Sequence, residues 1–261
     1  MVRFASVYRN NRLAECPFSM VLRFKSIVIA VTSLPFTGLI LCTLSSFYVS
    51  FDEVTEAICG VSNFIPSISA VTGIAPQLYF WRFAVGLHST PRVLMAVIYL
   101  RYHKFFVDHM HYPNLFNFVL NASFVLNMID LATFVGVAYV SNSENFPIHE
   151  RLFVVFLSAS SLYMLVTIAI HEILRFRKLL GFRMTHSLRV KKIFFGLTMF
   201  FLSFLVYHFY QHRFRCKPNA FSWFSASEYG IAVANMGFHM TAAYDFQDLI
   251  FVTSMRKISS K

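Results

Sequence analysis

Side chains that could bind an anion or move a proton lie at or inside an apolar segment, 83–100, that is long enough to cross a bilayer: Arg82, His88, Ser89 and Arg92. At 100° per residue along a helix, all four fall within about a third of the circumference. This polar stripe suits an anionic head group, because Arg pairs well with phosphate. The alternative is that Arg82 snorkels to the membrane interface while Arg92 pairs with an acid on another helix.

A second polar stripe lies in the apolar segment 221–243. Glu228, Asn235 and His239 follow one another at intervals of seven and four residues, which places them on one helix face. At 1.5 Å per residue this face is about 16 Å long. It could hold a general base and its orienting partner, or it could make hydrogen bonds between helices, and the spacing alone favours the second role.

A third candidate is the pair His149 and Glu150, which directly precedes the apolar segment 152–174. A His beside an acid can serve as a general base. A carboxylate at this position also complements a helix N-terminus, and we favour this structural role.

Other polar clusters are interpreted as structural. In the segment 114–140, we assign four residues to packing between helices: Asn117, Asn121, Asn127 and Asp130. The segment 101–113 carries His103, Asp108, His109 and His111. Residues two apart face away from each other on a helix, so the spacing matches no pair of metal ligands and predicts a solvated loop. No metal site and no cofactor are predicted.

The elements that must position these residues are membrane helices. Hydrophobic residues make up 57% of the 261 and charged residues 13%, which is about half the ~25% typical of soluble domains. Six apolar segments are long enough to cross a bilayer: 26–48, 83–100, 114–140, 152–174, 193–210 and 221–243. The sequence therefore predicts an all-α, polytopic membrane bundle of about six transmembrane helices, with residues 1–261 as a single domain.

Lysine and arginine predict the orientation of this bundle. Seventeen of the 23 fall on one side and five on the other, with Arg92 inside a span. By the positive-inside rule both termini are cytosolic, and the loops near 51–82, 145 and 215 face the lumen. The net charge of +11 is spread over loops instead of forming one basic domain, so no nucleic-acid partner is predicted.

The cysteines fall into different compartments under this orientation. Cys59 and Cys216 are lumenal, whereas Cys42 lies in the first span and Cys16 is cytosolic. Because an oxidising lumen permits disulfides, we hypothesise a Cys59–Cys216 bond between the first and fifth loops, with two free thiols as the alternative.

Several strings in the chain resemble the post-GPI-attachment-to-proteins factor 2 family of membrane proteins. The strings occur in the family's order at 59–67, 76–77, 81–83, 86–92, 139–141, 148–150, 228–229, 235–236, 238–241 and 245–246. The chain departs from the family in having Ala243 and Tyr244 where the pattern carries Trp before Asp245, and in an unusually basic cytosolic-side segment from Arg175 to Lys192.

The resemblance implies a multi-pass protein of the Golgi and/or endoplasmic reticulum membrane that acts in fatty-acid remodelling of glycosylphosphatidylinositol (GPI) anchors. In that process a saturated chain is added back to the lyso-GPI intermediate at sn-2. The lipid moiety of GPI-anchored proteins would be the substrate. Membrane lipids and other GPI-remodelling proteins would be the further partners.

Two functions are compatible with the resemblance. In the favoured one the chain is an acyltransferase, in which Arg82 and Arg92 hold the inositol phosphate. The base that would deprotonate the sn-2 hydroxyl is His88, His149 or His239, paired with Glu150 or Glu228. The supporting polar residues are Ser89, Asn235 and Asp245. The acyl donor is acyl-CoA or a phospholipid. In the alternative, the chain is a non-catalytic lipid-binding or scaffold subunit that presents lyso-GPI to a separate acyltransferase.

Overall fold

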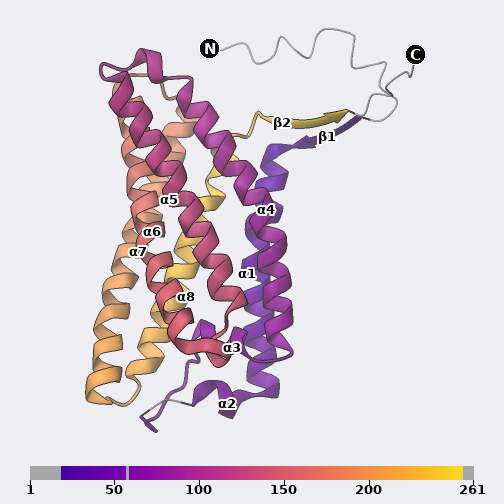
Figure 1. The fold of residues 1–261 in the computed structure, drawn as a ribbon, viewed down its shortest axis with the longest axis vertical. Coiled ribbons are helices and arrows are strands. Elements are labelled where there is room, and N and C mark those ends of the chain that lie inside the picture. Colours follow the sequence, from indigo (N-terminus) through magenta and orange to yellow (C-terminus); the bar gives the residue numbers. More distant parts are fainter. Residues whose placement is uncertain (1–18, 57–58, 255–261) are drawn as a thin grey trace.

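The computed structural model describes residues 19–56 and 59–254, which form a bundle of long helices (Figure 1). The predicted helical membrane bundle is thereby confirmed. Cys16 and the C-terminal tail lie outside the described residues. The long helices are α1 (Phe24–Val49), α4 (Gln77–Lys104), α5 (Pro113–Tyr139), α6 (Asn142–Phe176), α7 (Phe182–Arg215) and α8 (Ala220–Met240). Shorter helices join or extend them: α2 (Phe51–Thr55), α3 (Ile68–Gly73), η3 (Val107–His109) and α9 (Ala242–Asp245).

Five of the helices in the described residues are long and apolar enough to cross a membrane: α1, α4 with its continuation to His109, α5, α6 and α7. The sixth predicted span corresponds to α8, which packs against α7. Its 21 residues would be about 32 Å long, close to the ~30 Å of a hydrocarbon core. Several Ser residues and the polar stripe lower the hydropathy of α8, which explains why it is not among the five.

Three helices extend well beyond the predicted segments. α4 includes Arg82, and α6 begins at Asn142 because the Ser141 side chain and Glu144 form a capping box. α7 begins at Phe182 and therefore contains Lys191, which was assigned to a cytosolic-side segment outside the spans. Its side chain is only 1% exposed inside the bundle, whereas the side of the membrane on which this segment lies stays a prediction.

A two-stranded antiparallel sheet, not predicted from the sequence, joins the two ends of the described chain. Strand β1 (Ser19–Arg23) pairs with β2 (Ile250–Ser254). The Phe24 amide continues the pairing by donating to the Leu249 carbonyl at 3.0 Å. Both ends therefore lie at one end of the bundle (Figure 1), as an even number of crossings requires. That this end faces the cytosol stays a prediction.

The opposite end of the bundle is closed by the first loop. A disulfide bond joins Cys59 to Cys216, with Cα atoms 5.6 Å apart, and ties this loop to the end of α7. The Asn219 amide also donates to the Ser62 carbonyl at 2.9 Å. The loop is thus fixed over the start of α8 and leads directly into α3.

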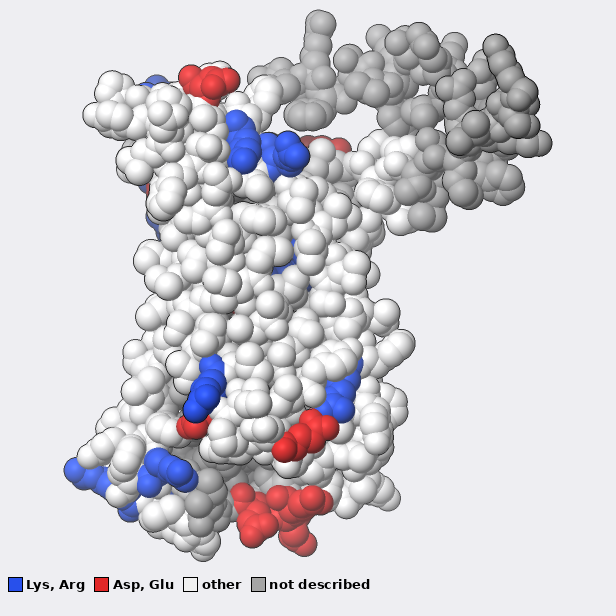
Figure 2. Space-filling model, in the orientation of Figure 1, with Lys and Arg blue, Asp and Glu red and all other residues white. Residues whose placement is uncertain are grey.

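Apolar side chains cover the outside of the bundle. Phe80, Phe83 and Phe118 are among the exposed ones. On the face shown in Figure 2, Lys, Arg, Asp and Glu lie mostly toward the two ends of the molecule. A surface of this kind is stable against lipid chains, which supports the membrane assignment.

Candidate functional site

A cavity of about 90 Å³ lies between α1, α3, α4, α5, α6 and α8. This is more space than a single water molecule needs. Its walls are apolar, with a group of aromatic rings formed by Trp81, Phe134, Phe153 and Phe156. Its polar lining residues form two groups, one near the first loop and one deeper in the bundle.

The inner group is built around a buried ion pair between α4 and α5. The Arg92 guanidinium donates to the Asp130 carboxylate at 2.9 Å and to the Asn127 side-chain oxygen at 3.1 Å. His88 lies 3.5 Å from Arg92 through Nε2, and its Nδ1 donates to the Val31 carbonyl at 2.7 Å. Because burial of an unpaired charge is costly, Arg92 needs these partners to be stable at this depth.

His239 faces the same ion pair from α8. Its Nε2 lies 3.7 Å from an Asp130 carboxylate oxygen, which is too long for a hydrogen bond, and its ring stacks on Tyr163 at 5.6 Å. Within the described residues, His239 Nε2 and Asp130 Oδ1 have no hydrogen-bond partner. Buried polar atoms are rarely left unpaired, so these two are places where a ligand or water can bind.

The outer group lies near the first loop. The Glu228 carboxylate accepts the Ile68 amide at 3.1 Å, which fixes the start of α3. His149 Nε2 lies 2.8 Å from the Ser69 hydroxyl, and His149 Nδ1 lies 2.7 Å from the Val140 carbonyl. A histidine with a hydroxyl on one nitrogen and an orienting acceptor on the other has the arrangement of a general base.

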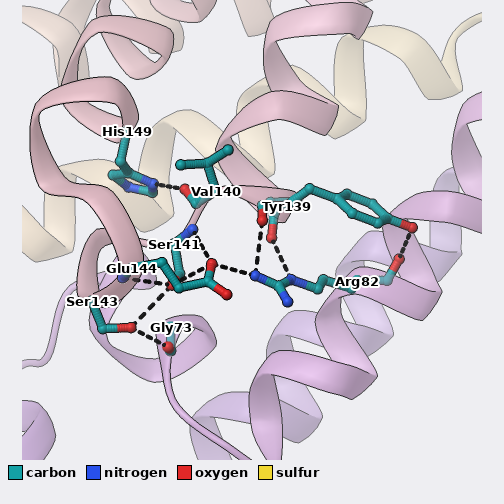
Figure 3. A network of polar contacts seen from close by, with 9 residues as sticks. Gly73, Arg82, Tyr139, Val140, Ser141, Ser143, Glu144 and His149 are labelled. Atoms are coloured by element: carbon teal, nitrogen blue, oxygen red, sulfur yellow. Dashed lines mark hydrogen bonds and ion pairs between the residues drawn. The ribbon is translucent and has the colours of Figure 1, made fainter.

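Arg82 does not belong to the cavity. It forms an ion pair with Glu144 and donates to the Tyr139 carbonyl at 2.8 Å (Figure 3). The same carboxylate accepts the Ser141 amide at 3.0 Å. The predicted stripe on α4 is therefore divided: His88 and Arg92 line the cavity, whereas Arg82 joins α4 to the junction of α5 and α6.

The remaining predicted residues also separate. Ser89 donates to the Gly86 carbonyl of its own helix at 2.8 Å, and Glu150 is exposed and does not line the cavity. Asn235 does line it and donates to the Ser160 hydroxyl. The structure thus brings together His88, Arg92, His149, Glu228, Asn235 and His239 around one cavity.

Asp245 belongs to a different buried cluster. Its carboxylate accepts from Lys191 and from the Tyr99 hydroxyl, and His171 Nε2 lies 4.0 Å away. His103 stacks edge-on against His171 with ring centres 5.1 Å apart. His103 is therefore buried, and its assignment to a solvated loop was wrong. Within the described residues, no group of His, Cys, Asp and Glu is arranged to hold a metal ion.

Three residues of the cavity region have partners that the sequence did not specify. Asn127 and Asp130, assigned to packing between helices, make such contacts with Arg92, so Asp130 is the acid on another helix that the alternative for Arg92 required. The signal was present for Asp130, because an ionisable residue inside a span marks a functional site by default. Ser69 carried no such signal, since its partner lies 80 residues away in the sequence.

The fold and the cavity define a multi-pass membrane protein with an amphipathic internal site. The model of the Frag1/DRAM/Sfk1/Cwh43P N-terminal domain family matches residues 23–249. The chain belongs to this family and, within it, to the post-GPI attachment to proteins factor 2 proteins, as its sequence strings predicted.

Individual relatives match over most of their length. "Post-GPI attachment to proteins factor 2-like" of Drosophila melanogaster is 39% identical over 225 residues, which cover 85% of this chain and 69% of the relative. "Acyltransferase PGAP2" of Xenopus tropicalis is 36% identical over 228 residues, covering 86% and 88%. "Post-GPI attachment to proteins factor 2" of Caenorhabditis elegans is 30% identical over 232 residues, covering 85% of each. No solved structure matches the chain.

Proposed function

We propose that this protein acts in fatty-acid remodelling of GPI anchors and reacylates the lyso-GPI intermediate at sn-2 with a saturated chain. Its setting would be the Golgi and/or endoplasmic reticulum membrane. The names of its relatives, two of which are called acyltransferases, support this assignment.

The observation that carries the proposal is the shape and lining of the cavity. An acyl transfer between lipids requires an apolar surface for the chain and a base beside the acceptor hydroxyl. The aromatic wall provides the first, and His149 at the outer end provides the second. Glu228 and His239 both line the cavity and lie about 16 Å apart along α8, which is roughly half the ~30 Å of a hydrocarbon core.

The predicted phosphate-binding role of Arg82 and Arg92 requires an exchange of partners. Each guanidinium already pairs with a carboxylate, Glu144 for Arg82 and Asp130 for Arg92. Arg92 is only 5% exposed, so the phosphate would have to displace Asp130 inside the bundle. A phosphate that binds Arg82 would not have to be buried in this way. In this proposal Arg82 is therefore the residue that binds the inositol phosphate.

The purified protein in liposomes, supplied with a labelled acyl donor and lyso-GPI, tests the proposal. We expect transfer by the wild type and a loss of about 100-fold or more in His149→Ala, because a positioned base contributes that much. His186→Ala is the matched control, since His186 is exposed and does not line the cavity. Transfer that is unaffected in His149→Ala, or absent from the wild type, contradicts the proposal.

The alternative function is a non-catalytic lipid-binding or scaffold subunit that presents lyso-GPI to a separate acyltransferase. The contacts of Arg92 favour it, because its guanidinium donates to both the Asp130 carboxylate and the Asn127 side-chain oxygen and is thereby held as structural ion pairs are. In the same assay this function predicts binding of lyso-GPI by the purified protein and transfer only when a second polypeptide is added.

A further inference from the structure

We infer that Ser69 and His149 form a catalytic pair in which the Ser69 hydroxyl carries the acyl chain as an ester between donor and acceptor. This inference rests on the proposed acyl transfer and names its intermediate. It starts from one contact, the 2.8 Å hydrogen bond between the Ser69 hydroxyl and His149 Nε2 at the outer end of the cavity.

The hydrogen bonds of His149 determine which nitrogen is the base. The Val140 carbonyl, 2.7 Å from Nδ1, can only accept, so Nδ1 carries a proton. In the neutral ring Nε2 is then an acceptor, and the Ser69 hydroxyl must donate to it. This is the direction in which an activated serine loses its proton, with a third group orienting the base.

The surrounding elements hold both side chains in place. His149 is 6% exposed and lies on α6 just after the non-helical residue Asn145, which turns the helix start toward α3. At the start of α3, the Ile68 amide donates to the Glu228 carboxylate of α8 at 3.1 Å, and toward its end the Ser46 hydroxyl of α1 donates to the Val71 carbonyl at 3.2 Å. The nucleophile therefore sits on a short helix that is tied to its neighbours at both ends, as preorganised catalysis requires.

Ser69 differs from the other hydroxyl residues that line the cavity in its partner, because the Thr32 and Thr72 hydroxyls donate to carbonyls of their own helices. It is half-buried and lines the cavity, so a chain bonded to its Oγ can lie along Trp81 and Phe134. Ser158 and Ser203, by contrast, donate to carbonyls of their own helices and lie on the exposed surface.

The two half-reactions balance. In the first, Ser69 Oγ bonds to the acyl carbon, the bond from that carbon to the donor breaks, and the serine proton passes through His149 to the departing donor oxygen or sulfur. In the second, the sn-2 hydroxyl of lyso-GPI bonds to the acyl carbon, the Ser69 ester breaks, and the hydroxyl proton returns through His149 to Ser69. The donor is an activated acyl ester, either a phospholipid oxygen ester or an acyl-CoA thioester.

A covalent relay gives each substrate the same site in turn. The cavity of about 90 Å³ has a single imidazole, that of His149, in its outer group, and a direct transfer would require donor and acceptor there together. With an acyl-Ser69 intermediate the donor remnant leaves before lyso-GPI binds. The reaction is then of the ping-pong type, which kinetics can detect.

Acyl exchange tests the inference with the full-length protein in liposomes without lyso-GPI. One arm contains phosphatidylcholine and labelled lysophosphatidylcholine, and the other contains acyl-CoA and labelled CoA. We expect label to enter the intact donor in one arm, and mass spectrometry to find an acyl group on the peptide that contains Ser69. Ser69→Ala and His149→Ala lower the exchange by more than about 100-fold. Ser158→Ala, on the exposed surface of α6, retains it.

Ser69→Cys keeps the test decisive if the alanine variant folds poorly. It preserves a nucleophile at the same position. The acyl group on this cysteine would be a thioester, so we expect neutral hydroxylamine to remove it. A purely structural hydrogen bond between α3 and α6 would leave no such signature. Absence of acyl-Ser69 and of exchange in both arms overturns the inference.

Adding lyso-GPI separates this inference from the proposed function. If Ser69→Ala transfers acyl chains to lyso-GPI at the rate of the wild type, the relay is overturned and the proposed function is left intact. An acyl-Ser69 that exchanges with the donor but is not discharged by lyso-GPI supports the pair and overturns lyso-GPI as its acceptor.

Discussion

At the scale of the residue, the cavity depends on charges that are stable only as a set. The Arg92 guanidinium and the Asp130 carboxylate lie in contact inside a bilayer-spanning bundle, with Asn127 and His88 as further partners. Taking two ions out of water is unfavourable, and their attraction offsets this only when the geometry is good and the remaining polar atoms are paired. Loss of one ion therefore lowers the free energy of unfolding more than loss of both.

We predict that Asp130→Ala lowers the free energy of unfolding by about 3–5 kcal/mol, because it leaves the Arg92 charge buried without its partner. The double change Arg92→Met with Asp130→Leu removes both charges and is expected to be less destabilising than Asp130→Ala. Thermal unfolding in detergent micelles measures the order. Asn121→Ala, at an exposed position of the same helix, serves as control with a change of less than about 0.5 kcal/mol. A double variant less stable than Asp130→Ala would refute the pairing.

Residue types at bilayer depth could be identified from sequence, whereas their partners could not. His88, Arg92, Glu228 and His239 stand out because ionisable groups are rare in spans, and the structure places all four around one cavity. Ser69 is an ordinary residue for a loop, and only folding brings it to His149.

At the scale of the element, the junction of α5 and α6 positions His149. The Ser141 hydroxyl accepts the Glu144 amide, and the Glu144 carboxylate accepts the Ser141 amide and pairs with Arg82 of α4. The Ser143 hydroxyl also donates to the Gly73 carbonyl of α3 at 2.7 Å. These contacts, drawn in Figure 3, join three helices at the outer end of the cavity.

We predict that Ser141→Ala lowers the free energy of unfolding by about 1 kcal/mol, because it removes the cap of α6. The start of α6 is then less ordered, so transfer activity should fall together with the thermal midpoint in detergent. Ser158→Ala, a serine of the same helix that has no capping role, should change neither. Equal midpoints for Ser141→Ala and Ser158→Ala would show that the capping box does not stabilise this junction.

Hydropathy predicts the interiors of the helices, and local hydrogen bonds determine their ends. Segment 152–174 was identified, but the preceding turns of α6 are polar. Ser141 caps the first of them, and the side-chain oxygen of the non-helical Asn145 accepts the Ile148 amide at 3.2 Å. The strands β1 and β2 pair segments from opposite ends of the sequence, and short runs such as 19–23 give no signal of a partner so far away.

At the scale of the whole molecule, the two ends of the bundle have different roles. One end holds the paired strands β1 and β2, and the other holds the disulfide-linked loop, α3 and the Ser69–His149 contact. The proposed acyl transfer would thus occur on the side of the membrane that the first loop faces. The distribution of Lys and Arg predicts that this side is the lumen.

Glycosylation of introduced acceptor sites tests this orientation. Gly60→Asn creates an Asn-x-Ser sequence with Ser62 in the first loop, at an exposed position with φ +62° and open space around it. Asn tolerates this left-handed conformation better than most residues, so the fold should be retained. We expect Gly60→Asn to gain a glycan that an endoglycosidase removes, because the transferase acts only in the lumen.

The matched variant at the other end is Asp108→Asn with Met110→Thr, which places the same kind of acceptor within η3. We expect no glycan there, since that end is cytosolic under the positive-inside rule. A glycan on this variant would show that the orientation is the opposite of the predicted one. Ser69 would then lie on the cytosolic side, where an acyl-CoA thioester could reach it directly. The two variants together therefore decide which leaflet supplies the donor for the proposed relay.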